Sequence, residues 1–266
     1  MREESAPADG GNPTGLDAYK PAEILRLVEA SGVGKTRLST RQLLALAILA
    51  GAFIGFGAAF YTVVVSGTEP GFGPARLLGG LSFCLGLILV VVGGAELFTG
   101  NALIVMAWVD RLVSTGALSR NWAFVFVGNI IGAVALAVAV KLSGLLVGDI
   151  AASAAAIAER KMALPFVEAF MRGVLCNALV CLAIWLTFAA RTVTGKILAI
   201  LWPITGFVAL GFEHSVANFY FLAAGLLSGA DGGVAGILRN LIPVTLGNIV
   251  GGAGGVALAY WTAYRR

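Results

Sequence analysis

Long apolar segments are the feature that most constrains the fold of this chain. Almost entirely apolar stretches cover residues 43–65, 75–108, 122–142, 165–189, 196–227 and 237–260. A helix needs about 20 such residues to cross a hydrocarbon core about 30 Å thick, where strand edges and loops exposed to lipid are not tolerated. The sequence therefore predicts an all-α membrane protein with six transmembrane helices.

Two of these segments, 75–108 and 196–227, are too long for one straight crossing. Each contains a polar block that begins with glycine: residues 94–101 read GAELFTGN and residues 211–218 read GFEHSVAN. Polar groups at membrane depth are costly unless they line a cavity or take part in function. We therefore predict that the second and fifth transmembrane helices are broken at these blocks.

The two polar blocks are related by a constant spacing. A shift of 117 residues places Gly94 on Gly211, Glu96 on Glu213 and Asn101 on Asn218. A shift of 119 places residues 128–130 on residues 247–249, both of which read GNI. Matches in the same order indicate a duplication. Because three helices per half reverse the chain direction, the predicted repeat is an inverted 3+3 arrangement.

The chain divides into a tail, a short helix and a membrane domain. Residues 1–20 are rich in Gly, Pro, Ser, Ala and Asp, which predicts a disordered tail. Residues 21–40 have the pattern of an amphipathic cytoplasmic helix on the membrane surface. Residues 41–264 form the predicted six-span transmembrane domain, with repeat halves at about 41–146 and 163–264.

Lysine and arginine are distributed unequally between the two sides of the predicted membrane domain. Twelve lie in the termini and in the connections on the same side as the termini, against five on the opposite side. The positive-inside rule then places both termini in the cytoplasm of a multi-pass protein of the inner or plasma membrane.

Composition excludes several other classes of protein. Charged residues are 12% of the chain, about half of what soluble domains contain, and the net charge of +4 comes from tails and loops, so no nucleic-acid surface is expected. The three cysteines lack CxxC spacing, and a single histidine cannot form a multi-histidine metal centre or bind haem on both faces. We expect neither a metal nor a cofactor.

His214, the only histidine, lies in the second polar block. Its unperturbed pKa near 6.5 allows proton exchange at physiological pH. Thr99 lies in the first block, and an inverted repeat would bring its hydroxyl close to the imidazole. The alternative interpretation is structural, with a neutral histidine tying the broken helix together and a threonine satisfying freed backbone groups.

Other charged and amide residues have structural and functional interpretations. The glutamates at both breaks are suited to capping half-helices or pairing with a cation, and the asparagines to hydrogen bonds between helices. These structural residues are Glu96, Glu213, Asn101, Asn218, Asn129 and Asn248. Lys161, before the fourth helix, either concentrates anions at a pore mouth or is an interfacial lysine. Arg172, deeper in that helix, faces a cavity or another subunit.

Five apolar residues either belong to an ordinary core or, if they face the axis, form apolar constrictions on either side of His214. They are Phe83, Leu87, Phe98, Val180 and Phe207. Apolar constrictions reject hydrated ions and pass small or neutralised species. The sequence does not show which way these side chains face.

From about Pro21 to its C-terminus the chain resembles the formate/nitrite transporter family. The resemblance rests on segments 94–101, 177–185, 211–218 and 240–252, above all on GFEHSVAN and the Leu-Phe-Thr of the other half. It implies an aquaporin-like protomer in a homopentamer, each protomer with its own anion pathway through the lipid bilayer. Residues 240–245, NLIPVT, are more similar to formate channels than to nitrite channels.

The resemblance also implies roles for individual residues. It makes His214 the central histidine, Thr99 its partner, Lys161 the lysine of the outer vestibule and Asn177 an amide beside the pore. The outer constriction would contain Phe83 and Phe207, and the inner one Leu87, Leu97, Phe98 and Val180. Arg172 departs from the apolar residue expected in formate channels, which leaves nitrite, hydrosulfide and lactate as alternative substrates.

The expected function is transport of a small monovalent anion, formate first, together with a proton that passes through His214. Within the same class, the pore could conduct the bare anion. A neutral-solute pore of the aquaporin type would carry Asn-Pro-Ala at both breaks, but the only Asn-Pro is Asn12-Pro13 in the tail. A hydrolase would have to rely on Ser215 beside His214, and neighbours in sequence rarely have triad geometry. We therefore expect no enzyme.

Overall fold

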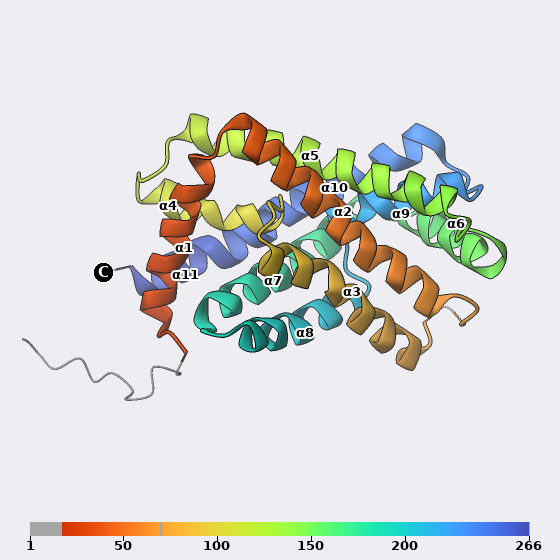
Figure 1. Cartoon of the computed structure of the whole chain (residues 1–266), viewed down its shortest axis with the longest axis horizontal. Helices are drawn as coiled ribbons and strands as arrows, with labels where there is room; N and C mark the ends of the chain where they lie inside the picture. Colours follow the sequence, from red (N-terminus) through yellow and green to blue (C-terminus); the bar gives the residue numbers. More distant parts are fainter. Residues whose placement is uncertain (1–17, 70, 266) are drawn as a thin grey trace, which may run out of the picture.

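The computed structural model describes residues 18–69 and 71–265, so most of the predicted tail at 1–20 lies outside the described residues. Helices make up most of this part of the chain (Figure 1). In order they are α1 (Pro21–Thr36), α2 (Thr40–Val65), α3 (Gly73–Gly93), η1 (Gly100–Ile104), α4 (Val105–Val109), α5 (Thr115–Leu142), α6 (Gly148–Met162), α7 (Phe166–Ala189), α8 (Val193–Ala209), α9 (Ser215–Leu227), α10 (Gly233–Ile249), η2 (Val250–Leu258) and α11 (Ala259–Tyr264).

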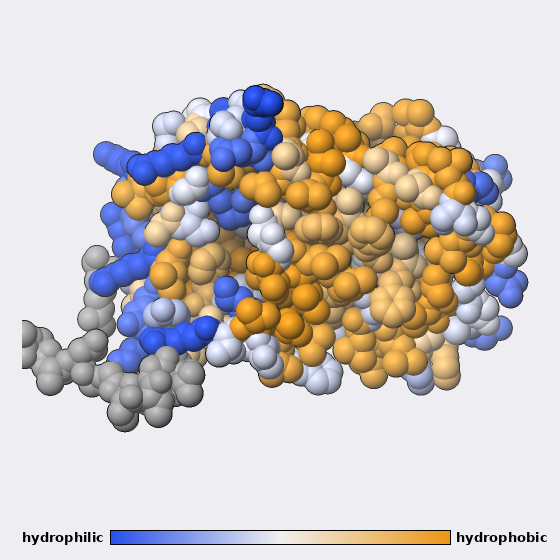
Figure 2. Space-filling model, viewed as in Figure 1, coloured by the Kyte–Doolittle hydropathy of each residue, from blue (hydrophilic) through white to orange (hydrophobic). Residues whose placement is uncertain are grey.

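Five helical stretches of the described chain are long and apolar enough to cross a membrane: α2, α3, α5, α7 and the run Gly233–Tyr264. The predicted fifth span is instead divided between α8 and α9, each too short to cross alone. Apolar side chains cover the flank of the molecule between two more polar ends (Figure 2). The chain is therefore a multi-pass membrane protein.

Both predicted breaks begin at a glycine with left-handed backbone geometry. Gly94 follows α3 with φ of 79°, and Gly211 follows α8 with φ of 74°. Residues with a side chain rarely adopt these angles, whereas glycine does so at little cost. The chain then runs without regular helix until Gly100 in the first case and Ser215 in the second.

The transmembrane helices pack in two similar groups. In one, α2 packs against α3 and α5, and in the other α7 packs against α8 and α10, while α3 contacts α8 between them. Small residues allow backbones to touch: a Cβ on Gly51 would lie 2.2 Å from the carbonyl oxygen of Asn129, and one on Gly247 would lie 2.2 Å from that of Phe170. These close contacts position the asparagines at the breaks. The inverted 3+3 arrangement itself stays a prediction.

Helix α1 lies across one end of the bundle, close to α4 and α11 (Figure 1). We call this the inner end. The apolar residues Ile24, Leu25 and Val28 are buried in a cluster with residues of η1, α4 and α7. In the described structure this face of α1 therefore packs on protein, and its predicted place on the membrane surface stays a prediction.

Candidate functional site

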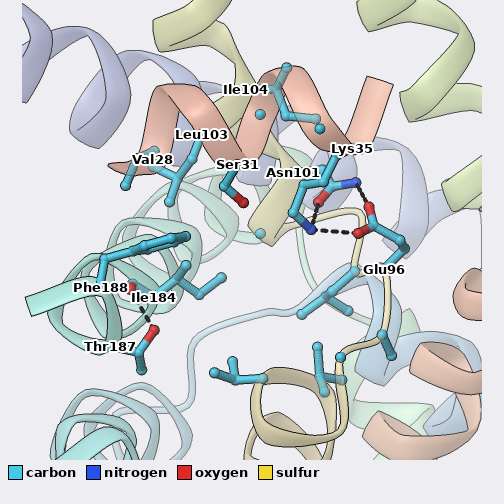
Figure 3. A pocket seen from close by; sticks show the side chains of 18 of the residues that line it. Val28, Ser31, Lys35, Glu96, Asn101, Leu103, Ile104, Ile184, Thr187 and Phe188 are labelled. Atoms are coloured by element: carbon cyan, nitrogen blue, oxygen red, sulfur yellow. Dashed lines mark hydrogen bonds and ion pairs between the residues drawn. The ribbon is translucent and has the colours of Figure 1, made fainter. Parts of the chain in front are cut away.

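We call the break that follows Gly94 the inner break, because its Glu96 is bonded to Lys35 of α1, and the break that follows Gly211 the outer break. At the inner break, a lysine, a glutamate and two asparagines form a closed hydrogen-bond network. Lys35 Nζ donates to Glu96 Oε1 at 2.7 Å and to Asn101 Oδ1 at 3.0 Å (Figure 3). Asn101 Nδ2 donates to Glu96 Oε2 at 2.7 Å and to Asn121 Oδ1 at 2.8 Å. Asn121 Nδ2 completes the ring by donating to the Lys35 carbonyl at 3.3 Å. The buried carboxylate is thus paired and fully hydrogen-bonded.

The outer break carries the same network built from the other half of the chain. Lys161 Nζ donates to Glu213 Oε1 at 2.8 Å, and Asn218 Nδ2 donates to Glu213 Oε2 at 2.7 Å. Asn218 Nδ2 also donates to Asn240 Oδ1, whose amide donates to the Lys161 carbonyl at 2.9 Å. Two bonds differ. Asn240 Nδ2 also donates to Glu213 Oε2 at 3.2 Å, and Asn218 Oδ1 has no partner within the described residues, whereas Asn101 Oδ1 accepts from Lys35.

A second pair of asparagines fixes the backbone of both breaks. Asn129 accepts from the Phe98 N–H at 2.9 Å and donates to the Glu96 carbonyl at 3.0 Å. Asn248 likewise accepts from the Ser215 N–H at 2.9 Å and donates to the Glu213 carbonyl at 2.9 Å. Backbone groups freed from helices inside a membrane need such partners, which explains the Gly-Asn-Ile motif in each half.

His214 and Thr99 meet where the two breaks come together. Thr99 Oγ1 lies 2.8 Å from His214 Nε2, and both residues are buried. Nδ1 of His214 accepts from the Ala217 N–H at 3.1 Å, so the imidazole caps the N-terminus of α9. Because Nδ1 acts as an acceptor, the proton of the neutral ring is on Nε2, which donates to Thr99. The ring also stacks on Phe207, with centroids 5.9 Å apart.

Asn177, on α7, links the inner break to α10 through two hydrogen bonds. Its Nδ2 donates to the Thr99 carbonyl at 3.2 Å and to the Asn248 carbonyl at 2.6 Å. A Cβ on Gly252 would lie 2.3 Å from this nitrogen. Gly252 belongs to the π-helical turn η2, a type of irregularity that is frequent at functional sites. Asn177 thus positions Thr99 through its backbone.

Two cavities approach this centre from opposite ends. The inner cavity, about 530 Å³, is lined by Ser31, Lys35, Glu96 and Leu97 among others. The outer cavity, about 470 Å³, is lined among others by Phe83, Lys161, Arg172, Phe207 and His214. The Phe83 and Phe207 rings meet edge to face, with centroids 5.6 Å apart.

The remaining apolar candidates, Leu87, Phe98 and Val180, are buried in the core and do not line either cavity. On α3, Leu87 lies one turn after Phe83 of the outer cavity and about one turn before Val90 of the inner cavity. Leu87 therefore lies between the two cavities along α3.

Arg172 holds the outer break through both its backbone and its side chain. Its carbonyl accepts from the Glu213 N–H at 3.2 Å, and its Nη1 donates to the Gly211 carbonyl at 3.2 Å. The guanidinium also pairs with Glu168, one turn earlier on α7. The side chain therefore faces the outer cavity and supports the loop that carries Glu213 and His214.

Sequence reasoning missed Lys35, Asn121 and Asn240. The two asparagines were detectable, because they are 119 residues apart, as are Asn129 and Asn248. Lys35 and Lys161 are 126 residues apart, a spacing that differs from the 117 or 119 residues between the other equivalent pairs. Each precedes its half of the predicted repeat, and only the fold shows that both reach equivalent glutamates.

Comparison with known proteins identifies the family. The family model of the formate/nitrite transporters matches residues 22–262. The chain belongs to the formate/nitrite transporter family. Among curated members, the formate channel FocA of Escherichia coli K12 is 37% identical, with 94% of this chain and 96% of that protein covered. A probable formate transporter of Methanothermobacter thermautotrophicus is 39% identical, covering 94% of this chain and 98% of its own length.

Solved structures of the formate/nitrite transporter family share the fold. An ion channel of this family superimposes with a TM-score of 0.85 at 31% identity, covering 91% of this chain and 98% of its own. A pentameric formate channel with formate bound gives a TM-score of 0.75 at 38% identity, covering 85% and 98%. These matches confirm the predicted family and the all-helical membrane fold.

Proposed function

We propose that this protein is a channel for small monovalent anions, formate first among them, and that the anion crosses the centre together with a proton. The observation that carries the proposal is the contact between Thr99 and His214, which lies between two cavities whose mouths contain lysines. The names of the formate channels that share 37% or more of the sequence favour formate.

The outer cavity has the charge expected of an anion entrance. Arg160, Lys161 and Arg172 line it, and Glu213 is the only acid among its lining residues in the described chain. Cations at a narrow mouth raise the local concentration of anions. We infer that anions gather there before they reach the Phe83 and Phe207 rings.

A bare carboxylate would lose its hydration between these rings and the layer of Leu87, Phe98 and Val180. Transfer of an ionised carboxylate into an apolar site costs many kcal/mol, whereas a neutral acid loses far less. We therefore infer that formate takes up a proton beside His214 and crosses the layer as formic acid.

The hydrogen bonds of His214 define how the ring would deliver that proton. A proton on Nδ1 displaces the Ala217 N–H, so the imidazolium loses the bond that caps α9. Loss of such a cap costs about 1 kcal/mol. The charged ring is thus disfavoured and gives its Nε2 proton to the anion, which leaves a neutral ring with its proton on Nδ1. Nδ1 has to release this proton before it can again accept from the Ala217 N–H, while Thr99 turns its hydroxyl toward either partner. Thr99 can do so because a hydroxyl both donates and accepts.

We also propose that the protein is a homopentamer in the cell membrane with both termini in the cytoplasm. The pentameric assembly of a formate channel with a TM-score of 0.75 supports the first part. Large apolar side chains exposed on the flanks, such as Phe56, Phe60, Ile131 and Trp202, suit contact with lipid or with a neighbouring subunit. The excess of cations near the termini supports the orientation.

The decisive experiment records formate uptake into proteoliposomes together with internal pH, for the native protein and for His214→Asn. Asparagine is a good N-cap, so this variant keeps an acceptor for the Ala217 N–H but has no titratable ring. We expect formate and protons to enter together in the native protein and the proton component to be lost in the variant. Thr99→Ser, which keeps the hydroxyl, serves as the conservative control and should retain both.

Two results would contradict the proposal. Uptake of formate without protons by the native protein would favour conduction of the bare anion. Absence of formate uptake would exclude the substrate, and nitrite, hydrosulfide and lactate would be tested next in the same vesicles.

A further inference from the structure

The inner cavity has a positive charge that its network of hydrogen bonds does not neutralise. Its charged lining residues in the described chain are Lys35, Glu96 and Lys196. Lys35 and Glu96 form an ion pair, so their charges cancel. Lys196 is half-buried in the first turn of α8, and its side-chain ammonium makes no hydrogen bond or ion pair with any described residue. The net charge of the lining is therefore that of Lys196.

Lys196 lies where the inner cavity meets a smaller one toward the surface. The smaller cavity, about 320 Å³, shares Thr187, Phe188 and Lys196 with the inner cavity, and its described lining contains no acid. The second cation of this lining, Arg191, stacks over the ring of Tyr19 at 4.2 Å. Any anion that takes this route to Glu96 and Leu97 thus passes Lys196.

Ser31 supplies a hydroxyl to the same cavity. It lies on α1, and Figure 3 shows its oxygen directed toward the space between α1 and Phe188. No hydrogen bond joins this hydroxyl to another described residue, whereas the hydroxyl of Thr187 donates to the Ile184 carbonyl at 2.7 Å. An ammonium with three free N–H donors and a free hydroxyl are together suited to a small oxyanion.

The opposite end of the protein has a cation in the corresponding place. Arg76 is the fourth residue of α3, as Lys196 is the fourth of α8. A Cβ on Gly211 would lie 3.0 Å from Arg76 Nη2, and Lys196 lines the same cavity as Gly94. Each cation is thus at the start of one broken helix. Arg76 lies beside the break of the other broken helix, whereas Lys196 shares a cavity with the break that begins at Gly94. The outer position differs, because Glu69 and Asp149 line the cavity next to Arg76.

From these observations we propose that Lys196 and Ser31 form an anion-binding site at the inner mouth, which receives a small monovalent oxyanion such as formate or nitrite before it reaches the Thr99–His214 centre. The inference rests on the proposed function. In this proposal Lys196, whose charge is free, binds the anion. Lys35, whose charge is cancelled by Glu96, holds the break in place. The inner mouth therefore sets the affinity for anions that leave the cell.

The test measures initial formate uptake into membrane vesicles of both orientations at low ionic strength. Inside-out vesicles present the inner mouth to the added formate, and right-side-out vesicles present the outer mouth. For Lys196→Gln we expect the half-saturating concentration at the inner face to rise about fivefold, the Boltzmann factor for a unit charge about 4 Å from an anion in water. The value at the outer face should not change. The difference in half-saturating concentration between Lys196→Gln and the native protein at the inner face should disappear at about 1 M salt, where the Debye length is about 3 Å.

A charge-restoring variant separates charge from structure. All three native cysteines are buried, so in Lys196→Cys the new thiol is the accessible target for thiol reagents. We expect a cationic methanethiosulfonate applied to inside-out vesicles to restore the native half-saturating concentration, and an anionic one to raise it further. Arg41→Gln removes an exposed cation at the start of α2 that lines neither inner cavity, and it should behave as the native protein.

Each outcome bears on one proposal. If Lys196→Gln matches Arg41→Gln, if both faces change equally, or if the two reagents act alike, the binding site at Lys196 is wrong. If the native protein moves neither formate nor nitrite from either face, the proposed function fails before the site is tested.

Discussion

The buried ion pair at the outer break makes a quantitative prediction about stability. In Lys161→Met the Glu213 carboxylate, whose side chain is 5% exposed, loses its cation and keeps two amide donors, from Asn218 and Asn240. Removing one partner of a buried pair typically costs about 3–5 kcal/mol, because the other charge stays buried without compensation. We expect the free energy of unfolding to fall by about this amount.

The double variant Lys161→Met/Glu213→Gln tests the cause of that loss. A glutamine oxygen still accepts from Asn218 and Asn240, and no uncompensated charge remains. The double variant should therefore recover most of the lost free energy and stay within about 1–2 kcal/mol of the native protein. The inner pair is the matched comparison. Lys35 is 28% exposed against 15% for Lys161, so water screens it better and Lys35→Met should cost less.

The assay is unfolding of the purified protein in mixed micelles by increasing mole fraction of sodium dodecyl sulfate, followed by circular dichroism. A loss below about 1 kcal/mol in Lys161→Met would mean that the pair behaves as an exposed salt bridge. A double variant as unstable as Lys161→Met would mean that the loss comes from packing of the lysine chain and not from a stranded charge. Either result would refute the reasoning.

Two further predictions concern packing and pH. Gly247→Ala should destabilise the protein by about 1–3 kcal/mol and lower its thermal unfolding temperature, because the new Cβ would lie 2.2 Å from the Phe170 carbonyl oxygen. Gly254→Ala, with no neighbour within 4 Å, should not. Burial, followed by contact with Asp110, raises the pKa of Glu29 in α1 from 4.5 to about 7. The folded state therefore binds the proton more tightly, so this stabilisation is complete below pH 4.5 and is lost as pH rises to about 7. Glu29→Gln should remove that part of the pH dependence of unfolding, and an unchanged profile would contradict it.

Hydropathy and spacing predicted most of the framework. Helices α2, α5 and α7 begin within seven residues of the predicted spans, and both breaks begin at the expected glycines. These features are local, since they depend on apolar length and on a glycine in left-handed geometry. The 117-residue shift also paired Glu96 with Glu213, whose carboxylates do receive equivalent hydrogen bonds.

The missing parts of the site depend on contacts that are distant in sequence. Lys35 reaches Glu96 from a helix that the sequence assigned to the membrane surface. The facing of Phe83 and Phe207 follows from how α3 packs on α8, and periodicity does not reveal it in helices that are apolar all round. The free charge of Lys196 is likewise visible only once the partners of every nearby side chain are known.

The two halves of the chain use equivalent lysine, glutamate and asparagine side chains to hold the breaks. They differ in the side chains that meet between the breaks, Thr99 and His214. Under the 117-residue shift His214 corresponds to Leu97, and Thr99 corresponds to Val216. His214 lines the outer cavity and Leu97 the inner one. A second histidine at the position of Leu97 would add a titratable ring to the inner cavity, so that each side of the centre could take up a charge. Because the two halves instead contribute one imidazole and one hydroxyl from non-equivalent positions, the duplicated scaffold supplies the proposed centre with a single titratable ring.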